Sequence, residues 1–210
     1  MLLNKRLLVF TILAAAFAAV LTHYDLYLLQ WVQSDNHAEP AFKVITEIGR
    51  SHWYLVPSGL VFFIGLKRVW RHRLWPQATL LFFAVSSSGI VVNILKPLFA
   101  RARPREFLRE EVTGFFHWPQ VLTGHLSDYN SFPSGHAATA LSAAVAIVFC
   151  LPQKYRWLRL PILAMGGVIA ASRVMVSAHY ASDVIIGALI GIWAVVLCKQ
   201  YLDNKLSKVN

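Results

Sequence analysis

Long apolar runs alternate with short polar segments along the whole chain. A helix that crosses a bilayer needs about 20 mainly apolar residues, and interfacial flanks let somewhat shorter runs serve. We therefore expect an all-α, polytopic membrane protein, folded as a single domain over residues 1–210, with no internal repeat and no linker. Six transmembrane helices are predicted at about residues 7–22, 53–66, 76–95, 136–151, 161–176 and 183–201.

The last two spans come from one nearly continuous helix-compatible run, Pro161 to Tyr201. A single helix of that length would reach about 60 Å, roughly twice the hydrocarbon thickness, so the run must contain a break. We place the break near Ser177, which puts Arg173 at the end of one helix and His179 at the start of the next.

A polar and aromatic stretch, residues 23–51, separates the first two spans. Apolar residues recur in it at helical spacing, which predicts two short interfacial helices. The recurring positions are Leu26, Leu29 and Val32 in the first helix, and Phe42, Ile45 and Ile48 in the second.

Composition agrees with a membrane protein, because 57% of the residues are hydrophobic, only 14% are charged, and the mean hydropathy is +0.52. The net charge of +10 comes from short basic clusters between apolar runs, which favours lipid head groups over nucleic acid as the partner. Most clusters fall on one side of the six-span arrangement, so we expect that side, with both termini, to be cytoplasmic. The clusters are Lys5–Arg6, Lys67–Arg73, Lys154–Arg159, and Lys199, Lys205 and Lys208.

One basic loop, Lys96 to Arg109, falls on the opposite side and breaks this charge rule. Either a function requires charges there, or the loop is long enough to escape the rule. For Arg101, Arg105 and Arg109 we consider two roles, selection of anionic head groups and a solvated loop face.

Three polar segments should meet at the outer ends of the helices: Lys96–Pro104, Pro133–His136 and Ser172–Asp183. Together they supply three cations, two histidines, a carboxylate, a serine and a glycine. Arginine and lysine bind tetrahedral oxyanions, and a helix N-terminus adds free N–H groups. The set therefore indicates a phosphate site.

His179 and Asp183 are four residues apart and should share a helical face. We expect the carboxylate to take one ring N–H and leave the other nitrogen free to act as a nucleophile or base. We also expect Asp183 to lie at a wet helix end. The alternative is a polar turn whose charges merely sit at the membrane interface.

The pattern Lys-x6-Arg-Pro, Pro-Ser-Gly-His, Ser-Arg-x5-His-x3-Asp resembles the three-part signature of the type 2 phosphatidic acid phosphatase family. The resemblance implies that His179 attacks phosphorus and forms a phosphohistidine, that Asp183 orients it, and that His136 is the general acid and then the base. It also implies a phosphate cradle and no metal or other cofactor. The cradle residues would be Lys96, Arg103, Ser134, Gly135 and Arg173.

The resemblance further implies a lipid phosphatase at the outer leaflet of a bacterial inner membrane. Candidate substrates are undecaprenyl diphosphate, phosphatidylglycerol phosphate, phosphatidic acid and the phosphates of lipid A. A phosphotransferase with a polyprenyl diphosphate donor is the first alternative. A non-enzymatic haem-binding or transport bundle is the second, which is disfavoured because His136 and His179 are expected at helix ends beside arginines.

Overall fold

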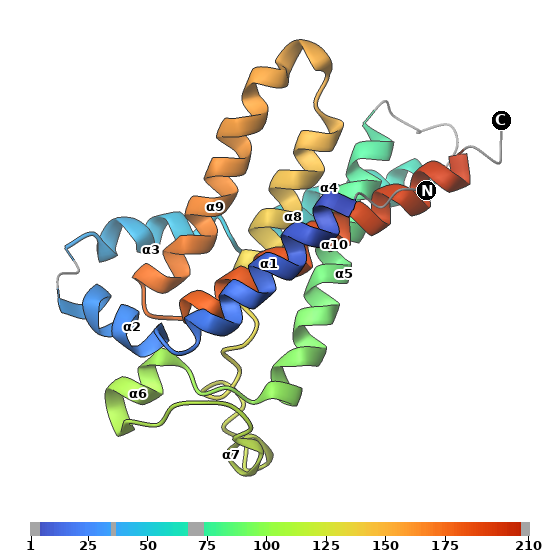
Figure 1. The fold of residues 1–210 in the computed structure, drawn as a ribbon. Coiled ribbons are helices and arrows are strands. Elements are labelled where there is room, and N and C mark those ends of the chain that lie inside the picture. Colours follow the sequence, from blue (N-terminus) through green and yellow to red (C-terminus); the bar gives the residue numbers. More distant parts are fainter. Residues whose placement is uncertain (1–4, 35–36, 67–73, 207–210) are drawn as a thin grey trace.

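The computed structural model describes residues 5–34, 37–66 and 74–206, and every regular element in those ranges is helical, which confirms the all-α class (Figure 1). The elements are α1 (Lys5–Leu21), α2 (Asp25–Ser34), α3 (Glu39–Glu47), α4 (His52–Gly65), α5 (Trp75–Phe99), α6 (Pro104–Glu110), α7 (Trp118–Leu122), α8 (Gly135–Cys150), the 3-10 helix η2 (Gln153–Leu158), α9 (Arg159–Met175) and α10 (Ala181–Leu206).

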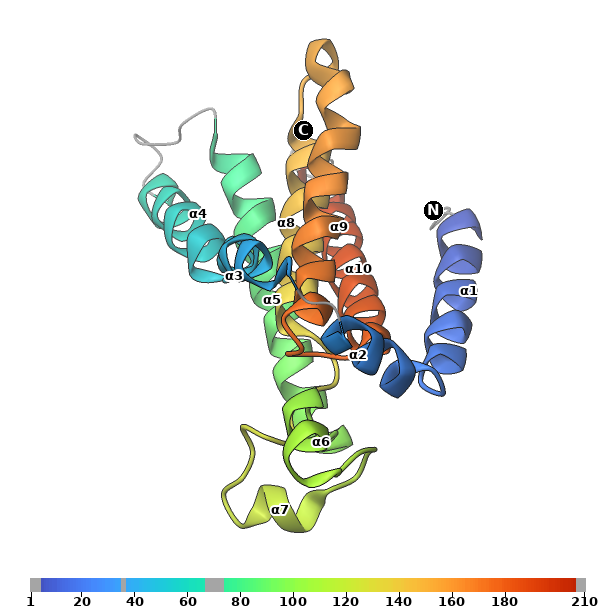
Figure 2. The same cartoon turned by 90° about the vertical axis from the view of Figure 1, so that its left-hand side faces the viewer.

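Helix α8 lies at the centre of the bundle, packed against α5, α9 and α10. Helix α1 covers α10 from one side, and α4 covers α5 from the other (Figures 1 and 2). The start of α1, η2 and the end of α10 lie toward one end of the bundle, whereas α6 and α7 lie beyond the other end. The C-terminal ends of α5 and α9 therefore meet the N-terminal ends of α8 and α10.

Each of the six predicted spans coincides with one helix, namely α1, α4, α5, α8, α9 or α10. Among the described helices, three segments are long and apolar enough to cross a membrane: residues 75–110, 153–175 and 181–205. A fourth is added if α1 and α2, bent by 70°, form one broken span. Since α4 and α8 are shorter, the count of six spans stays a prediction.

The start of α1, η2 and the end of α10, which carry basic residues in the sequence, lie toward the same end of the bundle, as the charge rule predicts. The Lys67–Arg73 cluster and Lys208 lie outside the described residues. The orientation in the membrane stays a prediction.

The break expected near Ser177 is confirmed, because α9 ends at Met175 and α10 begins at Ala181. Ser177 itself has a positive φ of 49°, a left-handed conformation that ends the helix. The two short helices expected in residues 23–51 are α2 and α3.

Small residues allow α8 and α10 to approach closely. A Cβ atom at Gly187 of α10 would overlap the carbonyl oxygen of Ser134, and one at Gly191 would overlap that of Ala138. Glycines four residues apart commonly let two membrane helices come together at the backbone. This contact brings the segment before α8 onto the first turns of α10.

Candidate active site

Backbone hydrogen bonds join the three polar segments into one site. The N–H of Ser134 donates to the carbonyl oxygen of Asp183 at 3.0 Å, which ties the second segment to the third. The N–H of Ser131, two residues before the second segment, donates to the carbonyl oxygen of Arg101 at 3.1 Å, which holds the second segment beside the first. The sequence segments predicted to meet are therefore adjacent at one end of the bundle.

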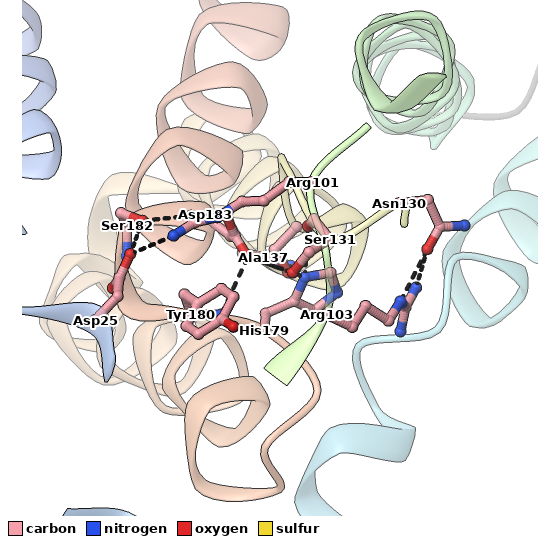
Figure 3. Close-up of polar contacts among 11 residues, drawn as sticks. Asp25, Arg101, Arg103, Asn130, Ser131, Ala137, His179, Tyr180, Ser182 and Asp183 are labelled. Atoms are coloured by element: carbon pink, nitrogen blue, oxygen red, sulfur yellow. Dashed lines mark hydrogen bonds and ion pairs between the residues drawn. The ribbon is translucent and has the colours of Figure 1, made fainter. Parts of the chain in front are cut away.

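His179 is buried, with 3% of its surface exposed, and its ring is oriented by a backbone carbonyl (Figure 3). Nδ1 lies 2.7 Å from the carbonyl oxygen of Ser131 and 3.7 Å from Oδ2 of Asp183. A carbonyl oxygen only accepts hydrogen bonds, so Nδ1 carries the proton and Nε2 keeps its lone pair. The free nitrogen is as predicted, but the prediction that Asp183 takes the ring N–H is wrong, because Ser131 stands closer.

Asp183 is fully buried, so the prediction of a wet helix end is wrong. Its carboxylate accepts hydrogen bonds from Ser131 Oγ at 2.6 Å, from the N–H of Tyr180 at 3.0 Å and from Arg101 Nη1 at 2.5 Å. The start of α10 is covered by the segment after α5 and by α2, which exclude water from it. Asp183 thus acts on His179 through its charge and through Ser131.

Arg101 is also buried, with 4% of its surface exposed. Its guanidinium pairs with Asp183 and, at 2.7 Å, with Asp25 Oδ2, and its Cζ atom lies 4.5 Å and 4.3 Å from the ring centroids of Phe115 and Tyr180. Neither predicted role, head-group selection or a solvated face, fits this residue. A guanidinium held between two carboxylates and two rings is part of the protein interior.

The other two arginines of that loop are exposed and do suit a solvated face. Arg105 pairs with Asp128, and Arg109 lies near Glu106 at 3.7 Å. Arg101 is buried whereas Arg105 and Arg109 are exposed, and the sequence alone gives no sign of this difference, because all three residues follow α5 within the same basic loop.

Burial lowers the pKa of His179 to about 4, although the neighbouring Asp183 carboxylate raises it. The imidazole is therefore neutral at pH 7, the form in which Nε2 can attack an electrophile.

Three cations lie near His179 and His136. The charges of Arg103 and Arg173 act on His179, and those of Arg173 and Lys96 act on His136. Arg103 directs Nε and Nη2 to Oδ1 of Asn130 at 2.8 and 2.6 Å, and Arg173 donates from Nη1 to Thr46 Oγ1 at 2.8 Å. Within the described part of the chain, Nε of Arg173 is buried with no hydrogen-bond partner. The charges of Arg103 and Arg173 repel that of Lys96. Clustered cations with an unused donor favour the binding of an anion.

The N-terminus of α8 adds backbone donors to this cluster. Ser134 caps the helix, with its Oγ accepting the N–H of Ala137 at 3.4 Å, and Gly135 and His136 form the first turn. The turn between α3 and α4 lies against His136, since a Cβ atom at Gly49 would be 3.1 Å from Cδ2 of that ring. The helix N-terminus thus opens toward the cations, beside a wall made by the α3–α4 turn.

Sequence reasoning missed four residues that hold this geometry: Asp25, Thr46, Asn130 and Ser131. They lie outside the three polar segments, and each is a single polar residue with no spacing that sets it apart. Only the position of α2 and α3 beside the site gives Asp25 and Thr46 a role.

In the described ranges, no group of three or more His, Cys, Asp or Glu side chains is placed to hold a metal ion. The polar groups that converge on the site are cations, histidines and backbone N–H groups, which suit an anion.

The sequence of this chain is similar to a known protein family and to curated proteins. The family model described as PAP2 superfamily matches residues 77–207. A "Lipid A 1-phosphatase" of Rhizobium johnstonii is 37% identical over 163 residues, which are 72% of this chain and 62% of that protein. The match thus spans less than two thirds of that relative's length.

Two crystal structures share the fold. A transmembrane PAP2 type phosphatidylglycerolphosphate phosphatase from Bacillus subtilis superposes with a TM-score of 0.67 at 21% identity, over 97% of this chain and 98% of that one. Aquifex aeolicus LpxE superposes with a TM-score of 0.61 at 22% identity, over 84% of this chain and 94% of that one. At such low identity these likenesses concern the fold.

Proposed function

Because this chain belongs to the PAP2 superfamily, we propose that it is an integral membrane phosphatase that hydrolyses a lipid phosphate through a phosphohistidine at His179. The observation that carries the proposal is the geometry of His179. Its Nδ1 is fixed on the Ser131 carbonyl, and its free Nε2 shares one end of the bundle with three cations. A neutral, immobilised imidazole beside an anion site is the arrangement that nucleophilic attack on phosphorus requires.

The reaction would take two steps. Nε2 of His179 attacks phosphorus, the bond from phosphorus to the lipid oxygen breaks, and His136 gives its proton to that oxygen. In the second step His136 accepts a proton from a water molecule as the water attacks phosphorus. The bond from phosphorus to Nε2 then breaks, which releases inorganic phosphate and restores both histidines.

Lys96, Arg103 and Arg173 would hold the non-bridging oxygens, together with the N–H groups that Ser134 and Gly135 place at the start of α8. Positive charge fixed by the protein stabilises the phosphoryl group in the transition state, a role that metal ions fill in many phosphotransferases. We therefore propose that the enzyme needs no metal.

Among the candidate lipids, the relationship to a lipid A 1-phosphatase favours the 1-phosphate of lipid A. The site lies at helix ends, where a lipid can present its head group while its acyl chains stay in the membrane. We place it at the outer face of a bacterial inner membrane, with both termini in the cytoplasm, because the opposite end carries the basic residues.

The test uses the purified protein in detergent with EDTA present. Lipid A, undecaprenyl diphosphate, phosphatidylglycerol phosphate and phosphatidic acid are offered separately, and free phosphate is measured. We expect phosphate release that EDTA does not reduce, inhibition by vanadate, and acid-labile label on His179 after an acid quench with radiolabelled substrate. His179→Ala should abolish both the release of phosphate and the acid-labile label. Label on a serine or a carboxylate would overturn the mechanism, and loss of activity that magnesium restores would overturn metal independence.

A phosphotransferase would behave differently in the same assay. It would give little free phosphate from one lipid alone, and would transfer label when a second lipid is added.

A further inference from the structure

A buried carboxylate that is distant in sequence from the three polar segments contacts two of their residues. Asp25, the first residue of α2, has 2% of its surface exposed. Its Oδ2 pairs with Arg101 Nη2 at 2.7 Å and accepts the hydroxyl of Ser182, while its Oδ1 accepts the N–H of Ser182 at 3.2 Å. Figure 3 shows this group behind Asp183, on the side away from Arg103.

The guanidinium of Arg101 therefore forms ion pairs with two carboxylates. Arg101 sends Nη1 to Asp183 and Nη2 to Asp25, and all three side chains are at most 5% exposed. Without Asp25, Arg101 and Asp183 would form a neutral pair. With Asp25, the group keeps one net negative charge, and burial makes that charge act strongly on its surroundings.

The charged groups near His179 include both a carboxylate and cations. Asp183 lies 3.7 Å from Nδ1, and the positive charges of Arg103 and Arg173 oppose protonation of the ring. His136, across the site, is influenced by the same ring. When Nε2 bonds to phosphorus, the ring becomes a cation with its Nδ1–H on Ser131. The negative charge behind Ser131 would have to offset two arginines.

We propose that Asp25 is a positioning residue for the reaction, which shares Arg101 with Asp183 so that a net negative charge stays behind His179 and stabilises the positive, phosphorylated ring. The inference rests on the proposed function. It gives α2 a role in the chemistry, although α2 lies outside the three polar segments.

The test is Asp25→Asn, which keeps the size and most hydrogen bonds of the side chain and removes its charge. We expect kcat to fall about tenfold or more, with KM within about twofold of wild type, because the phosphate cradle is unchanged. The control is Glu106→Gln, which removes another buried carboxylate, 4% exposed, from the same outer region but with no contact to Arg101. It should keep the wild-type kcat.

A second measurement distinguishes the loss of the Asp25 charge from a loss of packing around the site. Nitrogen NMR of labelled histidine follows the titration of His179, whose pKa is about 4 in the native protein. Loss of a negative charge in Asp25→Asn should lower that pKa by roughly one unit. If Asp25 were only structural, its loss would admit water and raise the pKa toward the ordinary value of about 6.5.

The outcomes are distinct. A wild-type kcat in Asp25→Asn, or a raised pKa of His179, would overturn the inference while phosphate release and label on His179 leave the proposed function intact. Label on another residue would overturn the proposed mechanism. In that case the NMR titration still decides whether Asp25 sets the charge behind His179.

Discussion

Nδ1 of His179 and Oδ2 of Asp183 lie 3.7 Å apart, beyond hydrogen-bond distance, although the two residues are four positions apart at the start of α10. Ser131 fills the space between them, with its carbonyl oxygen toward His179 and its hydroxyl toward Asp183. Orientation of the proposed nucleophile is therefore shared between a backbone carbonyl and a buried carboxylate.

Asp183→Asn should lower kcat by at least about 100-fold, since it removes the charge that supports the phosphorylated ring. It should also destabilise the protein by about 1 to 3 kcal/mol, because the buried donors of Ser131, Tyr180 and Arg101 lose part of their acceptor. Phosphate release and thermal unfolding in detergent check the two effects. An Asp183→Asn protein as stable as wild type would contradict the burial seen here.

The pH dependence of kcat/KM should be bell-shaped. The neutral form of His179 is the reactive one, and its pKa is lowered to about 4, so activity persists above that pH and is lost as the pH falls through it. The alkaline limb should appear where the site loses the proton that is passed to the leaving oxygen. Because both histidines face one phosphate, the limbs belong to the site as a whole. An acid limb centred near pH 6.5 would show that His179 is not buried in the active enzyme.

Thr46→Val should lower kcat/KM about fivefold, which corresponds to about 1 kcal/mol for one hydrogen bond. Thr46 Oγ1 accepts from Arg173 Nη1 at 2.8 Å, and valine has the same shape without the oxygen. Thr46→Ser is the control and should stay close to wild type. Equal losses in both variants would mean that the methyl group of Thr46, rather than its hydroxyl, holds Arg173.

Arg101→Met should destabilise the protein by about 3 to 5 kcal/mol, because it leaves Asp25 and Asp183 buried without their cation. The double variant Asp25→Asn/Arg101→Met should recover part of that loss, since one of the two uncompensated charges is gone. Thermal unfolding of the two proteins measures the difference. A double variant less stable than Arg101→Met would argue against a shared guanidinium.

Gly187→Ala should destabilise the contact of α10 with α8 by about 1 to 3 kcal/mol and reduce activity, because the new methyl group meets the Ser134 carbonyl. Gly89→Ala in α5 is the matched control, as a Cβ atom there meets no atom within 4 Å. It should be neutral or slightly stabilising. Similar losses in both variants would attribute the effect to glycine in general.

The sequence by itself determined the helices and the chemistry of the site. Continuous apolar runs fix where helices form because buried or lipid-exposed backbone must satisfy its own hydrogen bonds. The need for a break between residues 161 and 201 followed from length, and the polar residues placed it near Ser177. The histidines and cations were found because their spacing puts them at helix ends. These are local properties, which a single sequence carries.

Only the tertiary structure decided which polar groups are buried and which partner each one has. Nothing local distinguishes Arg101 from Arg105, yet α2 and the start of α10 enclose the first and leave the second in solvent. Asp25 reaches the site across 157 residues of sequence through the bend between α1 and α2. Burial and charge pairing depend on how helices distant in the chain pack together, and that packing gives Asp183 and His179 their environment.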